Sequence, residues 1–214
     1  MTDLAVRPFE LARARTSPLL IVAAGLLGGL SLGIAARAWM RLISEEPEFS
    51  WSGTLFIVIA FTIFGFTQSI AAVARCWARR RSTLTIARVL ATVGMLPLFV
   101  GAGAVMMPTV VGGGLATART DWPRLARVIG ALVATGPVIV VGAGLVDSFG
   151  WSVHSAAGII GLLALYGTII GATKFAFSPQ QDGWRLNRTL KAVVSVLVGL
   201  LLAFLVVGLM GARN

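Results

Sequence analysis

Six apolar runs, each long enough to cross a lipid bilayer, constrain this chain more than any other feature. The first, residues 18–36, is almost purely apolar, and a helix of that length crosses a hydrocarbon core of about 30 Å. In such a core only helices and closed barrels satisfy their own backbone hydrogen bonds. We therefore predict an all-α, polytopic integral membrane helix bundle. The other runs are residues 55–74, 84–118, 128–146, 153–173 and 192–210.

The composition excludes an ordinary soluble domain. Hydrophobic residues make up 57% of the 214 residues and charged residues 12%, whereas soluble domains carry about 25% charged residues. The formal net charge is +10, and the basic residues stand in short clusters beside the apolar runs, as at Arg79, Arg80 and Arg81. Such clusters hold loops at an anionic membrane surface. We therefore expect the lipid bilayer, with anionic lipids at its cytoplasmic face, as a partner, and no nucleic acid.

The run at residues 84–118 decides the topology. It is long for one span and short for two, and it contains prolines and a glycine triplet, which break helices. If it turns back near residues 101–103, every Lys and Arg except Arg37, Arg41 and Arg213 falls on the side of the N-terminus, as the positive-inside rule requires. We therefore predict six to seven membrane segments with a cytoplasmic N-terminus. The run would return as two short helices or as a re-entrant pair of half-helices.

Two segments outside the apolar runs complete the expected domain organisation. Residues 1–16 are polar and of mixed charge, which predicts a cytoplasmic N-terminal segment. Residues 17–214 form a single transmembrane helical domain. Within it, residues 174–191 are too polar to span and are expected to form an interfacial cytoplasmic loop.

Glycines at a spacing of four residues mark two helix faces for close packing. Gly25, Gly29 and Gly33 leave one face of the first helix almost bare, and Gly167 and Gly171 do the same further along the chain. Close van der Waals approach of such faces is a principal way for helices to associate in a bilayer. The faces predict packing within the bundle, and the alternative is a seam of a homo- or hetero-oligomer.

The most chemically suggestive stretch follows the first apolar run, at the outer face in this topology. It holds Arg37, Arg41, Glu45, Glu46 and Glu48. The arginines could hold a phosphate or carboxylate, and the carboxylates could supply acid–base chemistry or hold a divalent cation. The alternative is that the arginines extend to the membrane interface and the glutamates solvate a loop.

A second outer loop adds Asp147 and His154, which share this side of the membrane with the first stretch. Together the two stretches could form an outer polar pocket with His154 as a proton carrier. The alternative is that Asp147 or Ser152 caps a helix and His154 faces lipid headgroups.

No motif for a metal or cofactor accompanies these residues. The chain has one cysteine, Cys76, and one histidine, so we expect no metal site and no cofactor. No acidic residue lies in the middle of a predicted span, which argues against a pump built on a buried carboxylate.

Three strings resemble uncharacterised multi-pass membrane proteins of actinomycete (high-GC) bacteria. They are ARAWMRLIS at residues 36–44, PEFSWSGTLFIV at residues 47–58 and DGWRL at residues 182–186. The resemblance runs over most of the chain and implies a multi-pass protein of a bacterial plasma membrane. It implies no particular activity.

The sequence therefore predicts a membrane protein without fixing its biochemical role. The preferred hypothesis is a non-enzymatic, permease-like or accessory subunit that binds a solute, a lipid or a partner protein. The alternative is a membrane enzyme that acts on a phosphate-bearing lipid headgroup at the outer face.

Overall fold

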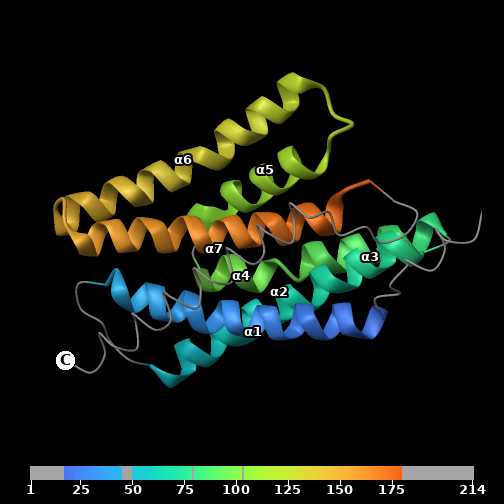
Figure 1. Ribbon diagram of the computed structural model, residues 1–214, viewed down its shortest axis with the longest axis horizontal. Coiled ribbons are helices and arrows are strands. Elements are labelled where there is room, and N and C mark those ends of the chain that lie inside the picture. The colour runs from blue at the N-terminus through green and yellow to red at the C-terminus, as the bar shows by residue number, and fades with distance from the viewer. Residues whose placement is uncertain (1–16, 45–49, 79, 103, 180–214) are drawn as a thin grey trace, which may run out of the picture.

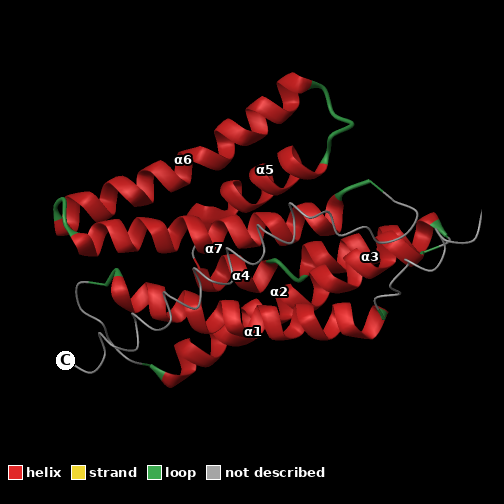
Figure 2. Cartoon of the chain, in the orientation of Figure 1, coloured by secondary structure: helices red, strands yellow, loops and turns green. Residues whose placement is uncertain are grey.

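The described chain is a bundle of helices joined by short loops (Figures 1 and 2). The computed structural model describes residues 17–44, 50–78, 80–102 and 104–179. Its elements are α1 (Pro18–Leu42), α2 (Trp51–Trp77), α3 (Arg81–Val93), α4 (Leu96–Ala102), the 3-10 turn η1 (Ala104–Met106), α5 (Met107–Ala118), α6 (Arg124–Phe149) and α7 (Val153–Phe177).

Five helical stretches of the described chain are long and apolar enough to cross a membrane. They are α1, α2, α6, α7 and the stretch Arg81–Val100, which joins α3 to most of α4. The apolar helix Ala104–Ala118 is shorter, and the run at residues 192–210 lies outside the described residues, as do residues 1–16. The all-helical membrane bundle is thus supported, while the count of six to seven segments stays a prediction.

Serine and proline set the starts of three helices. The Ser50 hydroxyl accepts from Gly53 N–H at 3.3 Å and caps α2, and Ser152 caps α7 in a reciprocal capping box with Ser155. For α6, Pro123 occupies the N-cap position without a side-chain cap, and the nearby Asp121 does not cap the helix. Asp121 instead accepts two hydrogen bonds from Arg119, because a bidentate charge-assisted pair is stronger than one capping bond.

Helices α1 and α2 pack against each other with their backbones in close approach. A Cβ added at Gly29 would overlap the carbonyl oxygen of Phe61, and one added at Gly33 would lie 2.8 Å from Val58 Cα. Gly65 of α2 faces Gly29 across the same seam. Only glycine leaves room for this approach, so the glycine face of α1, Gly25 included, lies against α2 of the same chain.

The run at residues 84–118 leads into the bundle and back out at the same end (Figure 1). α3 and α4 run antiparallel to α2, because Gln68 bonds to Ala91 while Leu98 and Phe64 lie in one buried cluster. Past η1, α5 runs the opposite way, antiparallel to α6. From Phe64 back to its start at Trp51, α2 extends about 20 Å toward the far end of the bundle, at about 1.5 Å per residue. α4 therefore ends well short of that end.

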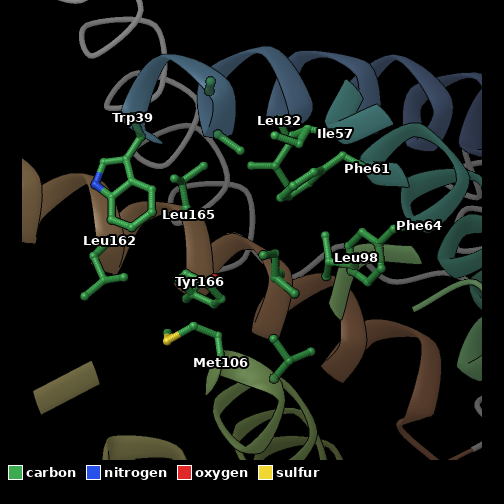
Figure 3. Close-up of a cluster of buried hydrophobic side chains, with 14 of the residues drawn as sticks. Leu32, Trp39, Ile57, Phe61, Phe64, Leu98, Met106, Leu162, Leu165 and Tyr166 are labelled. Atoms are coloured by element: carbon green, nitrogen blue, oxygen red, sulfur yellow. The ribbon is translucent and has the colours of Figure 1, made fainter. Parts of the chain in front are cut away.

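The main core lies where this returning segment meets α1, α2 and α7 (Figure 3). Met106, at the end of η1, lies next to Tyr166, which is near the middle of α7. Leu98 is almost fully buried in the same cluster. The turn between α4 and α5 thus lies beside the core near the middle of the bundle, with Leu98 and Met106 buried and Val100, Val105 and Met107 exposed.

The charged residues divide between the two ends of the bundle. At the end where α1 begins, which we name the basic end, lie eight of the described Lys and Arg residues. At the opposite end, the Arg37 end, α1 finishes, α2 begins and α6 passes into α7 (Figure 1). The basic end holds Arg75, Arg80, Arg81, Arg88, Arg119, Arg124, Arg127 and Lys174, and the Arg37 end holds Arg37 and Arg41.

Candidate functional site

At the Arg37 end, the last turns of α1 hold the two arginines of the first predicted stretch. Arg37 Nε donates to Thr54 Oγ1 at 3.0 Å, and Thr54 Oγ1 donates to the Ser50 carbonyl at 2.8 Å. Arg37 is thereby tied to the start of α2. Arg41 lies in the last turn of α1 and is exposed. Glu45, Glu46 and Glu48 fall outside the described residues.

The second predicted stretch lies at the junction of α6 and α7. Asp147 is exposed near the end of α6. His154 is half-buried, and its ring packs on Phe149 with the centroids 4.5 Å apart. Its Nε2 is buried and has no hydrogen-bond partner within the described chain.

Contacts of Trp39 and Gly158 join these two stretches at the same end of the bundle. Trp39 Nε1 donates to the Gly158 carbonyl at 2.8 Å, which fixes the end of α1 to the start of α7. Gly158 leaves room for Ile43 of the α1 C-cap and Leu145 of α6, each of which would lie 3.2 Å from an added Cβ. The described members of the two stretches, Arg37, Arg41, Asp147 and His154, thus lie at the same end of the bundle.

The two glycine faces that the sequence singled out have different surroundings. Gly25, Gly29 and Gly33 lie against α2 as described above. Around Gly167 and Gly171 of α7, an added Cβ would meet no described atom within 4 Å. This second glycine face is therefore open within the described part of the bundle.

Polar contacts inside the bundle fasten the returning segment. The Gln68 amide is buried and donates to the Ala91 carbonyl at 3.1 Å, which ties α2 to α3. Thr109 Oγ1 donates to the Ala134 carbonyl at 2.9 Å, which ties α5 to α6. These bonds satisfy the Gln68 amide N–H and the Thr109 hydroxyl, which lipid could not satisfy, whereas Gln68 Oε1 is buried without a partner among the described residues.

A cluster of arginines at the basic end was not singled out by the sequence. Arg75 of α2 is only 6% exposed, and its Cζ lies 4.5 Å from the centroid of the Phe175 ring in α7. Arg88 of α3 donates from Nη2 to the Ser178 carbonyl, which follows the last turn of α7, at 2.7 Å. Arg119, which follows α5, completes what we call the arginine cluster. The available signal was the helical spacing of Arg75 from the buried residues Gln68, Ala71 and Ala72.

Asp121 is the carboxylate that accompanies this cluster. Arg119 donates to its two carboxylate oxygens, from Nε at 2.9 Å and from Nη2 at 2.6 Å. These hydrogen bonds lower the pKa of the exposed Asp121 side chain. The Arg119 guanidinium also lies 5.6 Å from the Trp122 ring centroid, so the short loop before α6 is organised around one arginine.

Neither the described residues nor comparison with other proteins supplies a catalytic assignment. In the described ranges, no group of three or more His, Cys, Asp or Glu side chains is placed to hold a metal ion. Cys76 is half-buried and has a free thiol. No protein-family model, curated protein or solved structure matches this chain. The fold defines the class, a bundle of apolar helices compatible with a membrane protein, and the role must be argued from the bundle itself.

Proposed function

We propose that this chain is a non-enzymatic, permease-like or accessory subunit of a plasma membrane, which binds a solute, a lipid or a partner protein within its bundle. The observation that carries the proposal is the break between α4 and α5 beside Met106 and Tyr166. Backbone groups at a helix break lack helical partners and are tolerated at membrane depth only inside protein or along a water-filled cavity. Transporters use such discontinuous helices to bind their substrates.

The proposed topology has a cytoplasmic N-terminus and six to seven membrane segments. α1, α2, α6 and α7 cross the membrane, the run at residues 84–118 enters and returns, and residues 192–210 form the last crossing. The accumulation of arginines at the basic end supports a cytoplasmic location for that end. A reporter that is active only in the cytoplasm, fused after Asn214, should then be inactive, and an active fusion would contradict this topology.

The permease-like role is tested by asking whether water reaches the break. In a Cys76→Ala background the chain has no other cysteine, so a single Cys can be placed at Met106. A water-soluble, cationic methanethiosulfonate reagent should label this Cys in reconstituted vesicles. The matched control is Ile139→Cys, which lies on the exposed face of α6 at a similar depth and should face lipid. Labelling of Met106→Cys no faster than that of Ile139→Cys would refute a water path to the break.

The second candidate is a membrane enzyme that acts on a phosphate-bearing lipid headgroup at the outer face. The observation that favours it is His154, whose buried Nε2 has no partner among the described residues, at the same end as Arg37 and Arg41. If this role holds, Arg41→Ala and His154→Ala should each reproduce the lipid profile of a deletion strain. Two silent variants beside an altered deletion strain would exclude the enzyme.

A further inference from the structure

Arg75 carries a buried positive charge that the described chain compensates only in part. Its Nε is buried and has no hydrogen-bond partner in these ranges, and the contact that the group makes is with the face of the Phe175 ring. A cation removed from water loses far more hydration than an aromatic ring returns. The buried positive charge of Arg75 therefore needs an anion beside it.

The neighbouring arginines add to the positive charge. Arg88 reaches the end of α7 from the side of α3, and its own Nε is buried without a partner in the described part of the chain. Arg75 and Arg119 both act electrostatically on Arg88. Arg75 and Arg88 thus meet the end of α7, and Arg119 lies close enough to act on Arg88.

The described residues supply one carboxylate to this cluster. Asp121 and Asp147 are the acidic residues within the described ranges. Asp147 lies at the opposite end of the bundle, and Asp121 already accepts both of its hydrogen bonds from Arg119. One carboxylate against three arginines leaves an excess of positive charge.

We propose that the arginine cluster is a binding site for a phosphate-type oxyanion, with Arg75 and Arg88 as its principal ligands and Arg119 at its edge. A tetrahedral phosphate offers several acceptor oxygens, and guanidinium groups donate to them in pairs. Arg75 lies two residues before the end of α2 at Trp77, and Trp77 and Trp122 are both exposed. Tryptophans gather at the level of lipid headgroups, so the phosphate can come from an anionic phospholipid or from solution. This inference rests on the membrane placement proposed above and not on the permease-like role.

Stabilisation of the α7 C-terminus by its dipole is the competing explanation for these arginines. It accounts for Arg88, which bonds to a terminal carbonyl. It does not account for Arg75, which bonds to no described carbonyl and is the more deeply buried of the two.

The test uses the full chain in nanodiscs of phosphatidylcholine, either alone or mixed with phosphatidylglycerol. Thermal unfolding is measured in each, and inorganic phosphate is titrated into the phosphatidylcholine discs against chloride of equal ionic strength. Arg75→Gln and Arg119→Gln remove charge from the site. Arg81→Gln is the matched control, because it removes the same charge from an exposed position at the same end.

We expect at least one of the two anions to raise the unfolding temperature of the wild type and of Arg81→Gln. Arg75→Gln should weaken the effect at least tenfold, and without the anion it should unfold at a temperature no lower than that of the wild type. An effect of phosphatidylglycerol alone assigns the site to a lipid headgroup, and an effect of phosphate assigns it to the free oxyanion. Should Arg75→Gln fail to fold, the weakened response of Arg119→Gln carries the test.

Three results would overturn the inference. The first is that neither anion changes the unfolding temperature of the wild type. The second is an equal loss of the anion effect in Arg75→Gln, Arg119→Gln and Arg81→Gln. The third is that the substitution Asp182→Asn makes the unfolding temperature depend on added anion. The last would mean that the chain supplies its own counter-ion. The labelling of Met106→Cys involves none of these arginines, so failure of the site and failure of the permease-like role are distinguishable.

Discussion

Replacing Gly29 by leucine should separate α1 from α2 and destabilise the whole bundle. A Cβ at this position already overlaps the Phe61 carbonyl oxygen, and it would lie 3.0 Å from Thr62 Cα and 3.2 Å from Gly65 Cα. These are backbone atoms of a packed helix, which cannot move aside as a flexible side chain can. Over-packing a core costs about 1–3 kcal/mol, and a backbone overlap belongs at the top of that range.

The matched control is the same substitution one residue earlier. A Cβ at Gly28 meets nothing within 4 Å, so Gly28→Leu should cost nothing and should gain up to about 1 kcal/mol of helix propensity. The two variants are then separated by about 3 kcal/mol or more, which is over a hundredfold in the unfolding equilibrium, at about 1.4 kcal/mol per tenfold change.

The assay is thermal unfolding of the purified chain in a mild detergent, followed by circular dichroism. At about 2–4 °C per kcal/mol for a chain of this size, Gly29→Leu should melt at least about 6 °C below the wild type. Because the overlap begins at Cβ, Gly29→Ala should also lower the melting temperature. Equal melting temperatures for Gly29→Leu and Gly28→Leu would refute the reasoning.

Three further predictions concern single contacts. Trp39→Phe removes the hydrogen bond to the Gly158 carbonyl, which should cost about 0.5–1.5 kcal/mol in the same unfolding assay; no change would mean that the bond does not fix the two helices. Ser152→Ala removes the capping box of α7 and should cost about 1 kcal/mol, with Ser152→Thr as the control that keeps the cap. The pKa of Asp121 is lowered by Arg119, so its favourable contribution is present above about pH 4 and is lost as the pH falls through the lowered value. Asp121→Asn should therefore flatten the acid side of the stability profile, and an unchanged profile would contradict this.

The helices follow from the sequence because bilayer thickness and hydropathy act on each run separately. The turn expected near residues 101–103 has its counterpart in the reversal of direction between α4 and α5, since proline and glycine end helices whatever their neighbours are. The N-cap of α2 is a serine, Ser50, a residue type that prefers this position.

The contacts between helices could not be derived in this way. The glycine face of α1 was visible in the sequence, but its partner Gly65 was not, because a single glycine has no periodicity. Arg75 was interpreted as part of a basic loop flank. Its burial depends on which face of α2 meets α7, and only the packed bundle decides that.

The position of α5 has a consequence for how the chain is made. α5 packs mainly on α6 and α7, which both follow it in the sequence, while α1 and α2 are sequential and can pair as soon as both are synthesised. When α5 leaves the ribosome, its Gly112 and Gly113 faces have nothing to pack on, because their contacts are with α6 and α7. Domains emerge N-terminus first during synthesis, so α5 has no packing partners of its own until α6 and α7 have been synthesised. A nascent chain stalled before α7 should therefore be a substrate for membrane quality control.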